Sequence, residues 1–555
     1  MKKSFTRKFA VLLAAVMLFC SFTFTAAQTA SNASSTAASS EAAQSGDLPS
    51  AIADGAILHA WCWSFNTIKE NIPQIAEAGF KSVQTSPINA IKRGDNGGMC
   101  LKSENKGNWY YQYQPTDYTI GNYMLGTEEE FMAMCEEAHK YGVKIIVDIV
   151  ANHCSSDYSV ISSHVKSITQ KAFHDRVEIS DWSNRYQVTQ GKLTGLYDLN
   201  TQDAKVQKMI ADYMKDVLSK GADGFRFDAA KHIELPDDDP SYAGSFWPTV
   251  LDNSAEYQYG EILSGADRIG AYSRLMHVTA ESYGSNLQKA LAKKTMSAST
   301  VKNYKAYDEN LNDISPDRLV TWVESHDNYC GDAATWRLLD NKQIRQGWAI
   351  IAAQGDTTPL FFARPDGSST TDQWGKNTIG IAGDGNYFSN EVTAVNHFRN
   401  AMVGKDKNIV TVIKQKVTMI ERGNSGAVIV SVSDNDNTVN TETALPDGEY
   451  TDRANGGKFT VKNGVLTGEI KAGAVAVLYN DSVEPEYMIG DLNRNGQIDI
   501  QDATILQRHL AEFTNPDGTP IVDERDPVDF KIADFDGDGH ISVNDVTGIQ
   551  KVLAQ

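Results

Sequence analysis

The stretch that decides the fold is Gly224–His232, which reads Gly-Phe-Arg-Phe-Asp-Ala-Ala-Lys-His. Three other stretches have the same design, namely Lys144–His153 (KIIVDIVANH), Gln258–Leu263 (QYGEIL) and Leu319–Asp327 (LVTWVESHD). Each is a short apolar run, typical of a strand buried on both faces, and each ends in polar or charged residues. Reactive groups of parallel α/β barrels gather at the carboxyl ends of the strands. We therefore expect Asp228, Glu261 and Asp327 to meet at one face of such a barrel.

Residues 51–400 contain eight runs of this strand-like kind. They are Ile57–Trp63, Ser82–Ile88, Lys144–Val150, Gly224–Ala230, Gln258–Leu263, Val278–Tyr283, Leu319–Glu324 and Leu360–Arg364. Amphipathic helical stretches such as Glu128–Tyr141 and Ala204–Lys220 lie between several of them. Eight strands with helical crossovers predict a (β/α)8 TIM barrel of the α/β class. The polar and aromatic interval at about 154–200, after the third strand, is longer than one helix needs and predicts a small excursion over the active-site face.

The N-terminus has the features of a secretory signal peptide, which we place at residues 1–27. Lys2, Lys3, Arg7 and Lys8 precede an apolar run and then small residues around Ala27. A Ser- and Ala-rich linker at 28–50 follows. We therefore expect a secreted, extracellular protein with no membrane insertion of the mature chain.

Composition excludes one broad class of function. The hydrophobic share of 41% is ordinary for a globular protein, and the net charge is −20. A nucleic-acid binder needs clustered Lys and Arg, so no nucleic acid is expected as a partner; a neutral substrate or bound cations fit better. The five cysteines beyond the signal peptide are an odd number, so at least one thiol is unpaired unless it bridges another chain, and buried free thiols are favoured over disulfides.

The C-terminal third changes character twice. Residues 401–480 contain short β-rich runs divided by turn signals, which predicts a C-terminal antiparallel β domain. The expected strands are Val417–Glu421, Ala427–Val432, Lys458–Val461 and Val475–Leu478. A linker is placed at 481–488. In residues 489–555 the segment Asp491–Asp502 recurs as Asp534–Asp545, and a short amphipathic helix is expected after each copy.

Both repeated segments have the spacing of a calcium-binding loop. Oxygen-bearing side chains stand at loop positions 1, 3, 5, 9 and 12, glycine stands at position 6, and position 7 offers its backbone carbonyl. In loop order the expected ligands are Asp491, Asn493, Asn495, Gln497, Asp499 and Asp502 in the first copy, and Asp534, Asp536, Asp538, His540, Ser542 and Asp545 in the second. The repeat therefore predicts two calcium ions.

The three acids at the strand ends suit hydrolysis of a glycosidic bond with retention. One carboxylate attacks the anomeric carbon and a second group protonates the leaving oxygen, while a further negative charge favours an oxocarbenium-like transition state. Arg226, two residues before Asp228, is expected to keep that acid ionised. Other candidate substrate-binding residues are His153, His326, Trp109, Tyr110 and Tyr113. Any one of these residues alone would more often have a structural role. The hypothesis of a glycoside hydrolase rests on the presence of polar or charged residues at four strand ends of one barrel.

The four strand-end segments resemble the four sequence regions of the α-amylase superfamily, glycoside hydrolase family 13. The resemblance covers about residues 55–480 and includes HAWCWSFNTI, QTSPIN, NWYYQYQPTDY and GFRFDAAKHIELP. It implies that Asp228 is the nucleophile, Glu261 the general acid/base and Asp327 the stabiliser of the transition state. It also implies that the substrate is bound by Trp109, Tyr110, Tyr113, Gln114, His153, Arg226, Lys231, His232 and His326, with Lys231 and His232 on the leaving-group side.

The same resemblance implies a structural calcium ion in the barrel. Asn152 and Asp198 match the side-chain ligands of the family, and Thr189 and His232 match positions that offer backbone carbonyls. The C-terminal repeat resembles a dockerin, a small α module with two calcium loops whose implied partner is a cohesin on a scaffold protein. The pair Gln507–Arg508 recurs as Gln550–Lys551, and whether both faces bind is open.

These observations predict a secreted endo-acting α-amylase (glycoside hydrolase) that hydrolyses α-1,4 bonds of starch-like α-glucan polysaccharides and docks onto a scaffold-bound enzyme complex. Two alternatives stay open. One is a transglycosylase or debranching enzyme on the same barrel, which products from amylose and pullulan would reveal. The other is a catalytically silent starch-binding or adhesion protein, which would release no reducing sugar from starch.

Overall fold

The structure is a computed structural model, and it describes residues 48–104, 107–175, 178–263, 268–331, 333–405, 408–413, 415–480, 489–493, 497–515, 519–524 and 526–554. The expected signal peptide, most of the linker at 28–50, the linker at 481–488 and the expected ligand Asn495 lie outside the described residues. Of the helices within the described ranges, none is both long enough and apolar enough to cross a membrane.

The predicted barrel is confirmed. Eight parallel strands close into one sheet, and their order around the barrel is their order along the chain. The strands are β1 (Ile57–Ala60), β2 (Ser82–Thr85), β5 (Lys144–Ile149), β8 (Gly224–Phe227), β9 (Tyr257–Gly260), β10 (His277–Thr279), β11 (Leu319–Trp322) and β12 (Thr358–Phe362). Every expected run continues past the carboxyl end of its strand, and Val278–Tyr283 does so furthest. The end of that run is the first turn of helix α8, which buries Tyr283 between the barrel and its outer helices.

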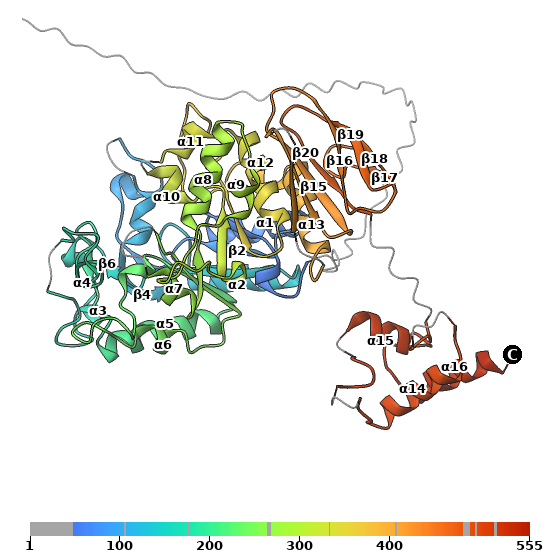
Figure 1. Cartoon of the computed structure of the whole chain (residues 1–555). Coiled ribbons are helices and arrows are strands. Elements are labelled where there is room, and N and C mark those ends of the chain that lie inside the picture. The colour runs from blue at the N-terminus through green and yellow to red at the C-terminus, as the bar shows by residue number, and fades with distance from the viewer. Residues whose placement is uncertain are drawn as a thin grey trace, which may run out of the picture. The chain divides into compact units, whose positions relative to one another are not determined.

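Helices surround the barrel (Figure 1). Within the described part of residues 48–405 they are α1 (Phe65–Glu77), α2 (Glu128–Lys140), α3 (Ser163–Lys166), α4 (Arg185–Gln190), α5 (Ala204–Ser219), α6 (Phe246–Val250), α7 (Ile269–Ser273), α8 (Glu281–Ala292), α9 (Ala298–Lys302), α10 (His326–Cys330), α11 (Thr335–Leu338), α12 (Asn341–Ala353) and α13 (Asn390–Ala401). Local sequence sets their boundaries. In α2, for example, the Thr127 side chain accepts the Glu130 backbone N–H and the Glu130 carboxylate accepts that of Thr127.

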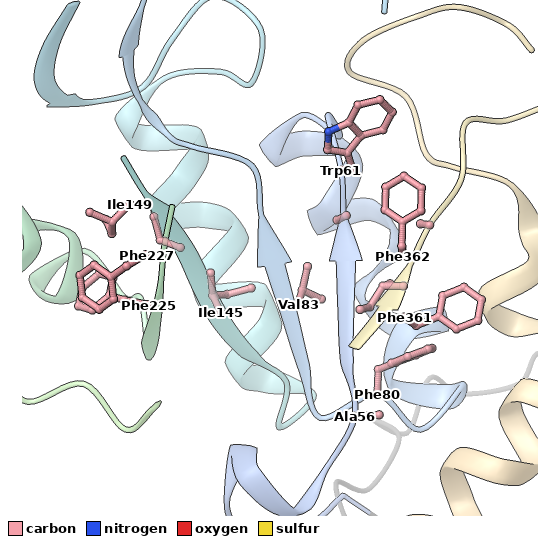
Figure 2. Packing of buried hydrophobic residues seen from close by; sticks show 14 of the residues in the cluster. Ala56, Trp61, Phe80, Val83, Ile145, Ile149, Phe225, Phe227, Phe361 and Phe362 are labelled. Atoms are coloured by element: carbon pink, nitrogen blue, oxygen red, sulfur yellow. The ribbon is translucent and has the colours of Figure 1, made fainter. Parts of the chain in front are cut away.

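Alternation along each strand divides the barrel residues into two sets. On β5, Ile145 and Ile149 point outward into the core shared with the helices, whereas Ile146 belongs to the cluster inside the barrel. Phe225 and Phe227 of β8 point outward in the same way, as Figure 2 shows for this layer. Because side chains alternate with a period of two, the residues next to these outward-facing ones on the same strand face the barrel axis. These are Asp148 on β5 and Arg226 on β8, and the two are register partners on neighbouring strands.

The excursion after the third barrel strand is built on a short antiparallel pair. Strand β6 (His153–Cys154) pairs with β7 (Tyr197–Asp198), which joins His153 to Asp198 in register. Helices α3 and α4 lie between them. The five cysteines are free thiols, three of them buried, as the sequence favoured.

The C-terminal β domain consists of two four-stranded antiparallel sheets. They contain β13 (Asn408–Ile413), β14 (Val417–Arg422), β15 (Gly426–Ser431) and β20 (Val475–Leu478) in one, and β16 (Asn437–Glu442), β17 (Gly448–Thr451), β18 (Lys458–Lys462) and β19 (Val465–Ile470) in the other. The four expected strands are present, and four more were missed. Strand β16 was missed because it buries only Val439, so the sequence NTVNTE carries little apolar signal.

The C-terminal segment forms helices α14 (Ile500–Leu510), α15 (Pro527–Ala533) and α16 (Val543–Leu553). Helices α14 and α16 follow the two repeated loops, as predicted, and contact each other. Leu506 and Ile549 are fully buried between them, whereas Phe513 lies beyond the end of α14 and is 59% exposed. Helix α15 was not predicted; it starts at Pro527 and is capped by Asp526.

Candidate active site

The expected catalytic acids stand beyond the carboxyl ends of three barrel strands, β8, β9 and β11, of which β8 and β9 are neighbours. Asp228 follows β8 by one residue, Glu261 follows β9 by one residue, and Asp327 lies in the first turn of α10, beyond β11. Tyr257, Tyr259 and Glu261 are two residues apart in turn, so the alternation that puts both tyrosines inside the barrel also directs Glu261 toward its axis. The same rule places Asp228 on the side of Arg226.

The guanidinium of Arg226 is the centre of the site. Its Nη1 donates to both oxygens of Asp148, at 2.7 and 2.8 Å, and to Oδ1 of Asp228 at 2.9 Å. Its Nη2 lies 2.9 Å from Oε1 of Glu261. Asp148 also accepts the Tyr113 hydroxyl at 3.1 Å. Asp148 was not predicted, because one acid inside an apolar run carries no signal until the register opposite Arg226 is known.

A strained turn follows the expected nucleophile. Ala229 has a φ of +48°, in the left-handed region that non-glycine residues rarely adopt, and this turns the chain directly after Asp228. The turn directs the Ala229 backbone N–H at Oε2 of Glu261, at a distance of 3.0 Å. Both Glu261 oxygens are therefore held by donors, one from Arg226 and one from the backbone.

One guanidinium shared by three buried carboxyl groups leaves too little positive charge for all of them. Burial raises the pKa of Asp228 to about 8, against the opposing charge of Arg226, and raises the pKa of Asp148 to about 6. Burial alone would raise the pKa of Glu261 as well, but Arg226 and the Ala229 N–H hold it below its ordinary value. The expectation that Arg226 would keep Asp228 ionised was therefore wrong, because Arg226 is shared with Asp148 and Glu261.

The histidines of the site are neutral near pH 7. Burial lowers the pKa of His153 to about 4 and that of His326 to about 3. His153 Nε2 lies 3.1 Å from the Tyr113 carbonyl oxygen and 3.9 Å from Oδ2 of Asp228. The His326 ring stacks on the Tyr113 ring with centroids 5.2 Å apart. Both rings can therefore offer uncharged polar edges to a hydroxylated substrate.

A cavity of about 340 Å³ opens above these residues. It is lined by Trp109, Tyr110, Tyr113, His153, Trp182, Leu193, Leu196, Asp228, Ala229, Lys231, His232, Glu261, Leu263, His326 and Asp327. Gln114 is not among them, and its Oε1 accepts hydrogen bonds from Ser155 and Ser156. Trp182, 46% exposed, comes from the excursion and was missed because sequence alone does not show which part of the excursion reaches the cavity.

The residues expected to hold a calcium ion in the barrel form two pairs, Asn152 with Asp198 and Thr189 with the turn of His232. Asp198 is 2% exposed, hydrogen-bonded by His174 Nδ1 at 2.7 Å and by the Asn152 amide, and burial raises its pKa to about 7. Thr189 lies on α4, which contacts the turn that contains His232. A buried carboxylate beside an amide and backbone carbonyls is an oxygen donor set that fits Ca²⁺, and a bound cation would stabilise the ionised form of Asp198.

The two C-terminal loops have the same internal hydrogen-bond pattern. In each, the carboxylate at position 12 accepts the backbone N–H of position 3 and that of position 9: Asp502 from Asn493 and Asp499, and Asp545 from Asp536 and Ser542. Both position-12 acids are fully buried. In the second loop the carboxylate oxygens of Asp534, Asp536 and Asp538 lie within 4.8 Å of one another. Three carboxylates so close together fit a divalent cation.

Comparison with known proteins identifies similar families and relatives. Residues 64–329 match the family described as alpha amylase, catalytic domain, and residues 489–554 match the dockerin type I domain. An α-amylase of Butyrivibrio fibrisolvens is 41% identical over 469 residues, which cover 77% of this chain and 47% of that protein. An α-amylase of Clostridium acetobutylicum is 36% identical over 453 residues, covering 79% of this chain and 56% of that protein. The chain thus spans about half the length of these curated relatives.

Solved structures agree on the fold. The wild-type α-amylase I of Eisenia fetida superimposes with a TM-score of 0.64 at 20% identity, covering 77% of this chain and 97% of that one. An α-amylase of Geobacillus thermoleovorans gives a TM-score of 0.60 at 17% identity, covering 77% and 98%. At these identities the likeness concerns the fold alone.

Proposed function

Residues 64–329 belong to the α-amylase catalytic-domain family and residues 489–554 to the type I dockerin family, and on this premise we propose that the chain is a secreted, endo-acting α-amylase. It hydrolyses internal α-1,4 bonds of starch-like glucans with retention of anomeric configuration, and it attaches to a cohesin-bearing scaffold through its dockerin. The observation that carries the proposal is the pair Asp228 and Glu261, held by the two terminal nitrogens of one guanidinium at the floor of the cavity.

In this mechanism the proton that burial keeps in the carboxyl cluster moves from Asp228 to Glu261 when the glucan displaces water from the cavity. The Asp228 carboxylate then attacks the anomeric carbon, and Glu261 donates its proton to the departing glycosidic oxygen as that bond breaks. Glu261 next takes a proton from water, whose oxygen attacks the anomeric carbon and releases Asp228. Two inversions at one carbon give net retention.

The other residues bind and orient the sugar. Asp327, whose side chain is 43% exposed, faces the cavity, and burial together with the charge of Glu261 raises its pKa. Once ionised, its carboxylate can stabilise positive charge on the sugar ring. Trp109, Tyr110 and Tyr113 offer flat apolar faces on one side, and Trp182 offers another beside Lys231. A calcium ion, when bound by Asp198, Asn152 and the carbonyls of Thr189 and His232, would fasten the excursion to the barrel.

The test is release of reducing sugar from soluble starch by the chain and by Asp228→Asn. We expect activity in the first and loss of at least about a thousandfold in the second, since the substitution removes the nucleophile with little change in volume. Products from amylose and pullulan separate the rivals. Transfer products or cleavage of α-1,6 bonds would favour a transglycosylase or a debranching enzyme, and binding of starch without release of sugar would favour a silent adhesion protein.

A further inference from the structure

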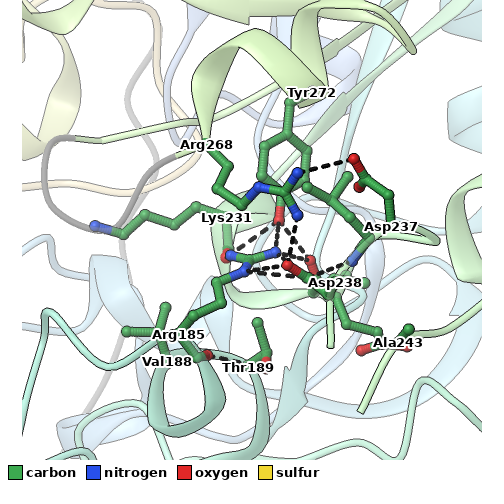
Figure 3. Close-up of polar contacts among 12 residues, drawn as sticks. Arg185, Val188, Thr189, Lys231, Asp237, Asp238, Ala243, Arg268 and Tyr272 are labelled. Carbon is green, nitrogen blue, oxygen red and sulfur yellow. Dashed lines mark hydrogen bonds and ion pairs between the residues drawn. The ribbon is translucent and has the colours of Figure 1, made fainter. Parts of the chain in front are cut away.

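An ionic cluster lies against the backbone that follows Asp228, where it contacts the carbonyl oxygens of Lys231 and Ile233. We call it the Arg185 cluster (Figure 3). It contains Arg185 of α4, Tyr272 of α7, Arg268 at the N-cap of α7, and Asp238. Arg185 Nη1 donates to the Lys231 carbonyl oxygen at 2.6 Å, and its Nη2 donates to the Tyr272 hydroxyl at 2.8 Å. The Tyr272 hydroxyl in turn donates to the Ile233 carbonyl oxygen at 2.5 Å and lies 3.2 Å from that of Lys231.

Asp238 holds the cluster together. Its carboxylate, with a side chain only 2% exposed, accepts from Arg185 Nε and Nη2, at 2.8 to 3.2 Å, and from Arg268 Nη1 at 2.7 Å. It also accepts the Leu235 backbone N–H at 2.8 Å. Burial alone would raise the pKa of Asp238, but the two guanidinium groups hold it below its ordinary value. The carboxylate therefore stays ionised and links three segments of the chain.

The three linked segments meet at one end of the cavity. Arg185 belongs to the excursion, three residues after Trp182; Arg268 belongs to the chain that follows Glu261; and the carbonyl of Lys231 belongs to the turn after Asp228. Figure 3 shows the Lys231 side chain extending away from the cluster, and its Nζ reaches the Leu263 carbonyl oxygen and lies 6.0 Å from the centre of the Trp182 ring. Helix α4 also holds His232, whose Nδ1 lies 2.9 Å from the Val188 carbonyl oxygen.

We propose that Arg185 is a positioning residue that fixes the separation between Trp182 and Lys231 across the leaving-group end of the cavity, and so determines how tightly the glucose units beyond the cleaved bond are bound. The inference rests on the proposed function. Arg185 lines no part of the cavity and touches no reacting atom, so it acts through the backbone of Lys231 and through α4. Its three nitrogens donate separately to a carbonyl, a hydroxyl and a carboxylate, whereas a lysine would have a single nitrogen for these three acceptors.

The test compares two substrates with Arg185→Lys and Tyr272→Phe. Maltohexaose places glucose units on both sides of the cleaved bond, whereas 4-nitrophenyl α-maltotrioside has only an aryl group on the leaving-group side. We expect Arg185→Lys to raise KM for maltohexaose about tenfold, with kcat changed by less than about twofold, and to leave kcat/KM for the aryl substrate within about twofold. Tyr272→Phe, which removes one hydroxyl from the same carbonyls, should change KM in the same direction by a smaller factor.

The matched control is Arg274→Lys, which makes the same exchange at a side chain 59% exposed, with one ion-pair contact at 3.5 Å to Glu309. If Arg185→Lys loses kcat/KM equally on both substrates and has a lowered Tm, its role is purely structural and the inference is overturned. An unchanged KM for maltohexaose in both Arg185→Lys and Tyr272→Phe would also overturn it. If Arg185→Lys does not fold, Tyr272→Phe alone decides between these results. Failure of the unsubstituted chain to cleave either substrate would instead refute the proposed function.

Discussion

Replacing Asp228 with Asn should make the barrel more stable near and above neutral pH, although it abolishes hydrolysis. Asp228 is 8% exposed, and burial raises its pKa from 3.8 to about 8. Asn keeps an oxygen that can accept the Arg226 Nη1–H at the position where Oδ1 accepts it now, at 2.9 Å. The substitution therefore removes a titrating group and keeps its principal hydrogen bond.

The sign follows from proton binding in the two states. The folded chain holds the Asp228 proton more tightly than the unfolded chain, so the unfolded state loses its proton first as the pH rises, and the free energy of unfolding of the original chain falls between about pH 4 and pH 8. A pKa raised from 3.8 to about 8 limits the resulting loss in the free energy of unfolding to about 6 kcal/mol. Because Asp148 and Glu261 share the guanidinium and take up part of the change, we expect the advantage of Asp228→Asn to grow by about 2–4 kcal/mol over this range.

The assay is thermal melting of both chains with calcium present, at pH 4, 6 and 8, with the exposed Asp252→Asn as control. We expect similar Tm values at pH 4 and a Tm for Asp228→Asn that is higher by about 2–6 °C at pH 8. Asp252→Asn should follow the original chain at every pH. A Tm difference that is constant with pH, or that shrinks as the pH rises, would refute the reasoning that burial outweighs Arg226 at Asp228.

Three further outcomes are expected. Glu261→Gln should lose at least about a hundredfold in kcat on starch but much less on a glucoside with an acidic aryl leaving group, which needs little protonation; steady-state kinetics on the two substrates check this. Chelation of calcium should lower the Tm of the barrel, because an ion bound only by the folded state stabilises that state, and Asp198→Ala should reproduce part of that loss in excess calcium. Calorimetry measures both effects, and an unchanged Tm after chelation and after Asp198→Ala would contradict this expectation. Deleting residues 489–555 should leave starch hydrolysis nearly unchanged and abolish calcium-dependent capture by a cohesin. Replacing both Asp491 and Asp534 by Ala should also abolish capture. Pull-downs with and without chelator measure the capture.

The barrel could be predicted because its strands are buried on both faces and therefore read as apolar runs. The three acids at the strand ends followed from the same pattern. Strand β16 could not be predicted, because a strand on a half-exposed sheet with one buried valine resembles a loop. The end of the Val278–Tyr283 strand was wrong because Tyr283 is buried equally well in the first turn of a helix.

The parts of the site that escaped prediction depend on contacts between distant segments. Asp148 is an ordinary-looking acid until strand register places it opposite Arg226. Trp182 reaches the cavity, and Arg185 reaches the Lys231 carbonyl, because the excursion returns over the barrel end, which no local pattern encodes. The charge state of Asp228 was predicted wrongly for a related reason: the sequence shows one arginine two residues away but not the two other carboxyl groups that share it.

The central claim is that Asp228 and Glu261 hydrolyse internal α-glucosidic bonds with retention, and timed proton NMR of amylose digestion tests it most directly. We expect the first new reducing ends to be α-anomers, which then equilibrate with β-anomers, and oligosaccharides of several lengths to appear before glucose. First-formed β-anomers would contradict the assignment of Asp228 as a nucleophile. Release of glucose alone from the earliest times would contradict the endo action.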